Sequence, residues 1–423
     1  MKVGFIGLGK LGFPCAVALE QVGGHEVRGF DVNPLVEKIL SERIAPYIEK
    51  DFPEYLKNTN LTLEKNIEDL LSWAEIIFIA VQTPHSELYE GATPVPNSKM
   101  DFDYSILESV AKEISVSLEK NPQINPLIVV ISTVLPGTMK DKVIPYLASQ
   151  RDVVRFCYNP YFIAMGTTIP DFLHPEFVLV GSLRNEDANL LESFYKTIHA
   201  APVKKMKIES AELTKVAYNT FIGFKIVFAN TLAEITAVRG GDVDEITDAL
   251  ALATTRLMSG KYLRAGMGDG GGCHPRDQIA MSWLAEDAGL SVDIFGWLAR
   301  ARDSQTKRQA DLIEEHHKST GLPICLLGWA YKPDTSLTVG SPARLLGTYL
   351  KEKNLNYEIY DPYVFPEKTL TSISSIFFVS TNHELFKSIV LPAGSVLIDP
   401  WGMKICMNDN GIKRITPGRL WQI

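Results

Sequence analysis

The 423-residue sequence predicts an α/β protein in which two doubly wound domains are joined by a central all-helical segment with one long connecting helix. Three observations predict this fold. Short apolar runs alternate with amphipathic stretches in the first part of the chain, an apolar helical pattern then runs from Ser210 to Gly240, and the alternation returns at Ile324. A chain of this length is expected to form two or three domains. We place them at residues 1–206, 207–310 and 311–423.

The expected elements follow from the apolar runs. In the first domain, alternating βαβ units predict a mostly parallel sheet with strands at Val3–Ile6, Glu26–Phe30, Ile76–Val81, Leu127–Ile131 and Phe177–Val180. The long helix is followed by predicted helices at Val243–Ala253 and Ala299–Lys318. The last domain restarts with a strand in Ile324–Ala330, and further strands are expected within YEIYDP, SIFFVST and SVLIDP.

Composition and charge exclude several classes of protein. A hydrophobic share of 46% and a charged share of 22% are ordinary for a soluble globular protein, and the formal net charge of -8 argues against nucleic acid or an anionic membrane as the main partner. The most apolar long segment, Phe221 to Val238, contains Lys225, Asn230 and Glu234, which predicts a buried helix and no membrane span.

The cysteines indicate a reducing compartment. Five are scattered along the chain without a CxxC pair, so we expect no metal site, no disulfide framework and a cytoplasmic location. The opening MKVGFIGLG does not have the layout of a signal peptide, because its apolar run is short and rich in glycine.

A glycine motif opens the chain between a predicted strand and a predicted helix. Gly7-Leu8-Gly9-Lys10-Leu11-Gly12 is a GxGxxG, whose glycines permit a tight turn and let a pyrophosphate approach the helix start. Asp31 closes the next strand, where a carboxylate binds ribose hydroxyls and repels a 2′-phosphate. We therefore expect a Rossmann-like NAD-binding domain that prefers NAD to NADP. The alternative is a glycine turn without a ligand.

Two polar residues share one face of the long apolar helix. Lys215 and Asn219 are one helical turn apart and can steady a developing oxyanion, although a snorkelling lysine beside a surface asparagine would give the same pattern.

A single thiol lies in the stretch GDGGGCHPRDQ. Cys273 could be a metal ligand, half of a disulfide, a buried apolar residue or a nucleophile. Glycines at 270, 271 and 272 leave it open, while Arg276 and a helix beginning at Pro275 favour a thiolate. The other cysteines lie in apolar or strand-like contexts, so Cys273 is the candidate nucleophile.

These motifs, in this order, resemble the nucleotide-sugar dehydrogenases of the UDP-glucose/GDP-mannose 6-dehydrogenase family over essentially the whole chain. After the GxGxxG, the resemblance is carried by Ala80-Val81-Gln82-Thr83-Pro84, Ser132-Thr133-Val134, Asn159-Pro160, Glu212-Leu213-Thr214-Lys215 with Asn219, the GGGCHPRD loop, Leu327-Gly328-Trp329-Ala330-Tyr331-Lys332-Pro333 and Tyr360-Asp361-Pro362.

The resemblance implies a four-electron oxidation. The C6 hydroxymethyl of a nucleotide-linked sugar, UDP-glucose-like, would become a carboxylate at the expense of two NAD, an activity used in polysaccharide biosynthesis. Cys273 would capture the aldehyde as a thiohemiacetal and then carry a thioester. Lys215 and Asn219 would stabilise oxyanions, and Thr133 and Asp277 would hold and activate water. A homodimer joined through the long helix is also implied.

The resemblance further implies two sets of binding residues. The cofactor set is Gly7, Gly9, Lys10, Leu11, Gly12, Asp31, Val81, Thr83, Thr133 and Arg276. The substrate set is Tyr161, Phe162, Ile163, Lys215, Asn219, Tyr262, Leu263, Arg264, Gly270 and Lys332, within which residues 262–266 resemble the loop that packs on the sugar nucleotide.

The chain departs from the family pattern at several positions. Tyr161 and Met165 replace two common glutamates, Val339 replaces an arginine, Asp399-Pro400-Trp401 replaces Asp-Gly-Arg, and Arg276 replaces a lysine. Tyr161 stands where a glutamate serves thioester hydrolysis, so it is expected to alter that catalytic step. Two other functions stay open: a two-electron β-hydroxyacid-type dehydrogenase, and a catalytically impaired protein that binds NAD or a sugar nucleotide.

Overall fold

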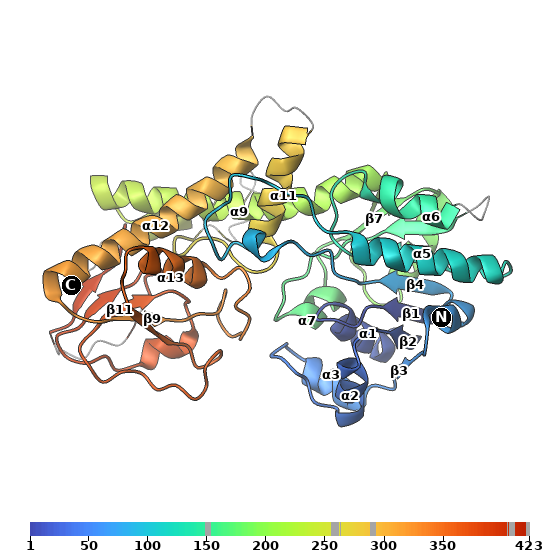
Figure 1. The fold of residues 1–423 in the computed structure, drawn as a ribbon, viewed down its shortest axis with the longest axis horizontal. Coiled ribbons are helices and arrows are strands. Elements are labelled where there is room, and N and C mark those ends of the chain that lie inside the picture. The colour runs from blue at the N-terminus through green and yellow to red at the C-terminus, as the bar shows by residue number, and fades with distance from the viewer. Residues whose placement is uncertain are drawn as a thin grey trace. The chain divides into compact units, whose positions relative to one another are not determined.

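The computed structural model describes residues 1–148, 154–254, 262, 264–287, 293–403, 405 and 411–419. The chain divides into two compact units, each drawn in Figure 1. The first unit comprises Met1–Pro84 and Asp101–Ala217, and the second comprises His85–Met100 and Tyr218–Ile423.

The first unit is built on an eight-stranded sheet. Neighbouring strands are parallel except for the antiparallel pair β6 and β7. Across the sheet the order is β3 (Thr62–Leu63), β2 (Glu26–Phe30), β1 (Lys2–Ile6), β4 (Ile76–Ile79), β5 (Leu127–Val130), β6 (Phe156–Tyr158), β7 (Val178–Ser182) and β8 (Val203–Met206). The direction of strand progression reverses between β1 and β4, which creates the crevice where doubly wound sheets bind ligands.

Helices cover both faces of this sheet. Val3 and Phe5 of β1 pack with α1 (Gly12–Gln21) in one core, whereas Gly4 lies so close to Leu70 of α4 (Ile67–Trp73) that a side chain there would touch it. Successive strand residues therefore face opposite helices. The other helical segments are α2 (Leu35–Glu42), α3 (Phe52–Asn58), α5 (Ser105–Lys120), the π-helix η2 (Met139–Val143), α6 (Ile144–Ala148), α7 (Thr168–Leu173) and α8 (Asn185–Tyr195).

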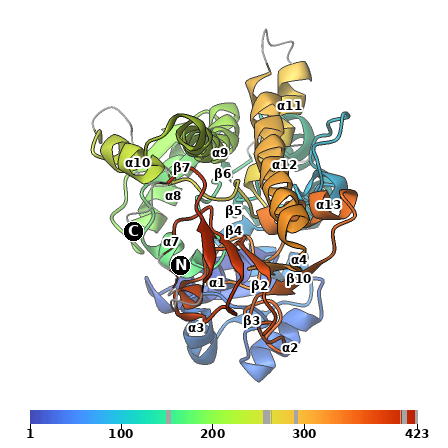
Figure 2. The ribbon, with the colours of Figure 1, turned by 90° about the vertical axis from the view of Figure 1, so that its left-hand side faces the viewer.

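Long helices dominate the central part of the chain. Helix α9 (Ile208–Arg239) is one continuous helix of 32 residues, so it spans roughly 48 Å. Its residues 208–217 belong to the first unit and the rest to the second. Helices α10 (Val243–Ala251), α11 (His274–Asp287) and α12 (Ile294–Thr320) follow, and α11 packs beside α12 (Figures 1 and 2).

The second unit contains a parallel sheet of five strands. Their order is β10 (Tyr357–Tyr360), β9 (Ile324–Leu327), β11 (Ile376–Val379), β12 (Val396–Ile398) and β13 (Lys413–Ile415). Helix α13 (Pro342–Glu352) packs against α12 (Figure 2) and contributes to the core on one face, while the short helix η3 (Glu384–Ser388) contributes to the core on the other. The remaining helix, η1 (Glu87–Tyr89), lies in the segment His85–Met100.

The start of the second sheet repeats a backbone arrangement of the first. The Gly7 N–H donates to the Phe30 carbonyl over 2.9 Å, and the Gly328 N–H donates to the Tyr360 carbonyl over 2.9 Å. Both glycines have φ values of +94° and +96° respectively, in the region that favours glycine. Asp361 occupies the place in the second sheet that Asp31 has in the first.

The observed architecture confirms the predicted fold class. The predicted strands are present, although β4 ends at Ile79 and β7 runs from Val178 to Ser182. Strands β3, β6, β8 and β13 were not predicted. Strands β3, β8 and β13 lack the apolar run that marks the predicted strands, and β6 spans only three residues without a longer apolar run around it. Pro275 is the second residue of α11, which begins at His274. Among the helices of the described part of the chain, none has the length and apolar character that a membrane crossing requires.

Candidate active site

The glycine turn forms the first part of the site, at the crevice between β1 and β4. A side chain at Gly7 would come within 2.9 Å of the Ala80 carbonyl oxygen, and one at Gly12 would overlap the Gly7 carbonyl. Nothing lies within 4 Å of the position that a Gly9 side chain would take, so this backbone is open to a ligand. The turn therefore fits the pyrophosphate of a dinucleotide at the start of α1, next to Lys10 and Leu11.

Asp31 lies at the end of β2 and faces this turn. One carboxylate oxygen accepts the Leu8 N–H over 2.6 Å and the other accepts the Asn33 N–H over 2.8 Å. The side chain is partly exposed, and a carboxylate has lone pairs left to accept two ribose hydroxyls. The glycine turn and the Asp31 carboxylate are therefore suited to bind the pyrophosphate and a ribose of NAD.

The segments that follow β4 and β5 are tied to each other. The Thr83 hydroxyl donates to the Thr133 carbonyl over 2.7 Å, and the Ser132 hydroxyl donates to the Val81 carbonyl over 2.6 Å. Because adjacent parallel strands end at the same sheet edge, Val81, Thr83 and Thr133 lie together at the edge that carries the glycine turn.

Tyr161 is held inside the first unit. Its hydroxyl and that of Tyr195 are hydrogen-bonded at 3.2 Å, Tyr195 also bonds Asn159, and the Tyr161 ring packs on Phe172 at 5.5 Å between centroids. Burial, with the neighbouring Tyr195, raises the pKa of Tyr161 well above its ordinary value. Ile163 packs against the same core. Tyr161 thus stays a neutral phenol at neutral pH.

Lys215 and Glu212 project from the first turns of α9 in the first unit. Lys215 is only 5% exposed, and its ammonium lies 5.1 Å from the Phe162 ring centroid, so two residues of the expected substrate set are in contact. Glu212 is fully buried and accepts the N–H groups of Gly137 and Met139 over 2.7 and 2.8 Å. Burial raises the pKa of Glu212 to about 7, although these two hydrogen bonds oppose the rise.

In the second unit, Asp277 is the centre of a buried cluster. The Asn219 amide donates to one of its carboxylate oxygens over 2.6 Å, and the Arg276 guanidinium lies 3.0 and 3.1 Å from the other. Asp277 is fully buried and Asn219 nearly so. The structure therefore brings together three of the expected site residues, with the asparagine amide directed at the aspartate.

Cys273 lies in the turn just before α11, and its carbonyl accepts the Asp277 N–H over 2.8 Å. The glycines ahead of it differ in their surroundings. A side chain at Gly270 would come within 2.7 Å of Pro342, and one at Gly271 would come within 2.8 Å of the Tyr331 ring. At Gly272 the nearest atom would be a Val339 methyl at 3.8 Å. Only the glycine next to the thiol therefore has open surroundings, and Cys273 itself is partly exposed.

His85 follows directly after Pro84 and belongs to the second unit. Burial and then the positive charge of Arg276 lower the pKa of His85 to about 4, whereas Asp277 acts weakly in the opposite direction. Its ring packs edge-on against Tyr89 at 5.6 Å. A neutral imidazole therefore lies within electrostatic reach of the Asp277–Arg276 pair.

The other expected substrate residues lie in loops of the second unit. Tyr262 has a φ of +71° and packs edge-on against His274 at 6.4 Å. Arg264 pairs with Asp248 at 3.2 Å, but both side chains are mostly exposed, so the pair contributes little to stability. The Lys332 ammonium lies 5.5 Å from the Tyr331 ring centroid. Leu263 and Cys406 fall outside the residues that the structure describes.

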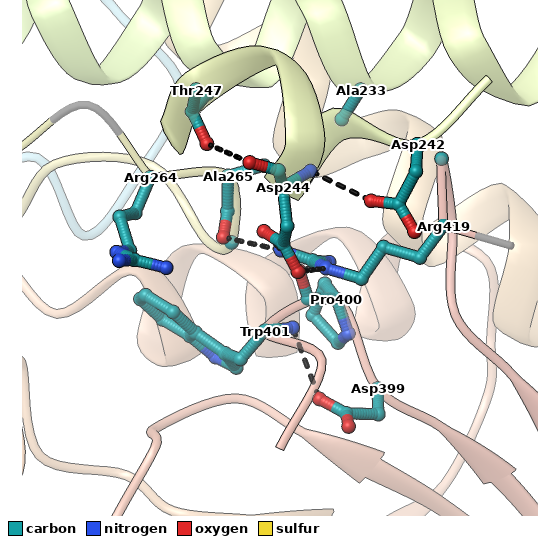
Figure 3. Close-up of polar contacts among 12 residues, drawn as sticks. Ala233, Asp242, Asp244, Thr247, Arg264, Ala265, Asp399, Pro400, Trp401 and Arg419 are labelled. Atoms are coloured by element: carbon teal, nitrogen blue, oxygen red, sulfur yellow. Dashed lines mark hydrogen bonds and ion pairs between the residues drawn. The ribbon is translucent and has the colours of Figure 1, made fainter. Parts of the chain in front are cut away.

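Trp401 and Arg419 hold the loop that contains Ala265 and Gly266. Trp401 covers Gly266 so closely that a side chain there would overlap its ring. Arg419 donates to the Ala265 carbonyl over 3.1 Å and binds both oxygens of Asp244 (Figure 3). The guanidinium of Arg419 thus contacts the same loop as Trp401. The family resemblance would place an arginine at position 401.

Sequence reasoning missed several residues of these clusters. Among the residues that the structure describes, Glu212, Asp269, Gln278 and Arg302 form buried polar contacts with the loops of the expected site residues, and His85 lies within electrostatic reach of Arg276 and Asp277. A charged residue on an otherwise apolar helix face, as at Glu212 and Arg302, is the signal that would have found two of them. Among the described residues, no three or more His, Cys, Asp or Glu side chains gather as metal ligands would.

An open glycine turn facing a strand-end carboxylate is how NAD-dependent dehydrogenases hold their cofactor, and the chain is an enzyme of that class. More narrowly, it belongs to the UDP-glucose/GDP-mannose dehydrogenase family. The NAD binding domain of that family matches residues 1–199, and the central domain of the family matches residues 209–302.

Individual relatives cover nearly the whole chain. GDP-mannose 6-dehydrogenase of Pseudomonas putida is 28% identical over 94% of this chain and 95% of its own length. UDP-glucose 6-dehydrogenase TuaD of Bacillus subtilis is 28% identical over 86% of this chain and 77% of its own length. Among solved structures, a UDP-glucose dehydrogenase from Pyrobaculum islandicum superposes with a TM-score of 0.84 at 25% identity, covering 99% and 98% of the two chains.

Proposed function

We propose that the protein oxidises the C6 hydroxymethyl of a nucleotide-linked sugar to a carboxylate in two NAD-dependent steps, with Cys273 as the nucleophile. The observation that carries this proposal is the position of the thiol: it is partly exposed at the start of α11, beside the open Gly272 and one helical turn before the buried Asp277. A thiol in this position is accessible to a carbonyl carbon that approaches from the side of Gly272.

In this proposal Cys273 carries the sugar from the aldehyde to the acid. NAD, when bound, accepts the hydride in each of the two oxidations. The alcohol first loses a hydride from C6 and a proton from its hydroxyl and becomes an aldehyde. The thiolate then adds to the carbonyl carbon, and the oxygen takes up a proton to form a thiohemiacetal. Loss of the second hydride from C6 and of the hydroxyl proton gives a thioester. Water then adds to its carbonyl carbon, the C–S bond breaks, and the acid and the thiol are released.

The remaining roles are part of the same proposal. The Lys215 ammonium and the Asn219 amide stabilise the oxygen anions that form at C6. Asn219 also donates to Asp277, so the same amide fixes the carboxylate that binds the attacking water together with Thr133. Lys332, Arg264 and Tyr262 contact the nucleotide sugar in this scheme, and Arg276 contacts the cofactor.

The substrate is best sought by measuring NADH formation with UDP- and GDP-linked hexoses, including UDP-glucose and GDP-mannose. We expect two NADH per sugar acid with one of them, and no net acid from Cys273→Ser, because a serine alkoxide is scarce at neutral pH. Cys325→Ser is the matched control, since Cys325 is buried in β9. A Cys273→Ser enzyme with ordinary activity would exclude the covalent mechanism.

The same assay separates the two rival functions. A two-electron dehydrogenase would form one NADH per sugar, and a non-catalytic binding protein would form none. The cluster of Asn219, Asp277 and Arg276 around the cysteine turn favours the four-electron reaction.

Three further expectations belong to this proposal. The first is that the chain folds as three regions, residues 1–206, 207–310 and 311–423, whose borders limited proteolysis would locate. The second is a homodimer formed through α9. The third is a reducing, cytoplasmic location, which the buried thiols of Cys15, Cys157 and Cys325 support.

A further inference from the structure

The segment that carries the proposed nucleophile is rich in glycine, and its last glycine, Gly272, has open surroundings. Gly270, Gly271 and Gly272 precede Cys273, and glycine populates more backbone conformations than any other residue. A reacting group must be held near its attack position, and a displacement of about 1 Å can cost about 100-fold in rate. Contacts from residues other than these glycines must therefore hold the backbone of this segment in one conformation.

A buried hydrogen bond closes the segment at its base. The Gln278 amide donates to a carboxylate oxygen of Asp269 over 2.6 Å, and both side chains are almost completely buried. Gly223 of α9 packs directly on this bond, because a side chain there would overlap the Gln278 amide and approach Asp269 to 3.2 Å. Asp269 precedes the three glycines and Gln278 lies in the second turn of α11, so the bond joins the two ends of the cysteine segment.

Arg302 of α12 supports Asp269 from the other side. Its Nε lies 3.0 Å from the Asp269 carbonyl oxygen and 3.1 Å from a carboxylate oxygen, and the side chain is only 2% exposed. Burying a guanidinium this deeply is costly unless it is paired and hydrogen-bonded. Here the pairing partner is the residue at which the glycine segment begins.

Arg302 also binds a second loop that packs on the cysteine turn. Its guanidinium donates to the Gly91 carbonyl over 3.0 Å. Asp303, the next residue, accepts the Val95 N–H over 2.5 Å. Gly91 touches Pro275 so closely that a side chain there would come within 2.5 Å of that ring. The loop that contains Gly91 and Val95 therefore packs against the first turn of α11.

We propose that Asp269, Gln278 and Arg302, together the cysteine latch, are positioning residues that hold Cys273 in its reactive place. The latch acts through the backbone and does not touch the substrate. This inference depends on one part of the proposed function, namely that Cys273 is the nucleophile.

Gln278→Met is the sharpest variant, because it keeps the length of the side chain but removes the donor to Asp269. We expect kcat to fall about 10- to 100-fold with KM changed less than about threefold, since orientation and not binding is lost. Arg302→Lys keeps the charge but loses the forked geometry, and should lower kcat in the same way. Arg414→Lys is the matched control, because Arg414 is also buried and paired with an aspartate, Asp399, at 2.8 Å.

A second readout does not depend on the substrate. The alkylation rate of Cys273 by iodoacetamide, followed by peptide mass spectrometry at neutral pH, should differ at least about fivefold between Gln278→Met and wild type, because the loosened segment changes the exposure of a thiol that is only partly exposed in the native fold. Melting temperatures identify variants that are merely unfolded.

Equal alkylation rates in Gln278→Met and Arg414→Lys would overturn the latch. If the wild-type protein forms no NADH with any nucleotide sugar, the proposed function fails, whereas the alkylation comparison still decides whether the latch exists.

Discussion

At the scale of single residues, Tyr161 has the clearest chemical consequence. Its phenol is neutral at neutral pH and hydrogen-bonded to Tyr195, so it cannot take a proton from water as a carboxylate would. If the proposed thioester forms, its hydrolysis should be slow. We expect a burst of NADH before the steady rate, and a sugar-nucleotide acyl adduct on Cys273 in acid-quenched enzyme by intact-protein mass spectrometry.

Substitution at this position tests the explanation. Tyr161→Glu should shrink both the burst and the adduct, because it introduces a carboxylate. Tyr161→Phe is the control and should leave both in place, since it removes only the bond to Tyr195. Quenched wild-type enzyme without adduct or burst would show that deacylation is not limiting.

At the scale of elements, Glu212 joins α9 to the start of η2. Its carboxylate accepts two N–H groups near the beginning of that helix, and burial raises its pKa to about 7. The folded protein therefore keeps a proton that the unfolded chain releases near pH 4.3, and stability is lost as pH rises through the folded pKa.

Glu212→Gln should remove this dependence. In urea unfolding, the loss of unfolding free energy between pH 5 and pH 8 should be smaller in the variant by roughly 1–3 kcal/mol. The variant should also be less stable at pH 5, because an amide cannot accept both N–H groups. Glu245→Gln, an exposed change in α10, is the control. Identical pH profiles for wild type and Glu212→Gln would contradict the assignment.

The elements also show what the sequence could predict. Long periodic segments such as α9 and α12, and strands flanked by glycine or aspartate, were predictable because their patterns are local. Cys273 and Asn219 were chosen as candidates because their residue types are chemically unusual in their context, whereas Asp277 was expected only from the family resemblance. Asp269, Gln278 and Arg302 were not predicted, because their pairing joins a loop to two helices and no local spacing encodes it.

At the scale of the whole molecule, α9 displays an apolar stripe that the described part of the second unit leaves exposed. Phe221, Phe224 and Phe228 lie on one face of the helix and are 47%, 46% and 42% exposed. Large exposed aromatic residues in a row are typical of a surface that pairs with another chain. This stripe supports the proposed homodimer.

A charged residue introduced into this apolar stripe tests the proposed homodimer. Phe224→Glu should convert the protein to monomers in sedimentation at micromolar concentration, because the carboxylate would be buried without a partner. Leu252→Glu is the control, since Leu252 is 84% exposed outside α9. A wild-type protein that sediments as a monomer with full activity would refute the proposal.

The repeated turn at the start of the second sheet has a consequence for binding stoichiometry. Asp361 has the place of Asp31, but it is fully enclosed. One carboxylate oxygen accepts the N–H groups of Trp329 and Ala330 and a hydrogen bond from His383, and the other accepts the N–H groups of Tyr363 and Val364. No oxygen of Asp361 is left for a ribose, whereas Asp31 remains partly exposed. Titration calorimetry should therefore count one NAD per polypeptide, although the chain contains two sheets built on the same turn.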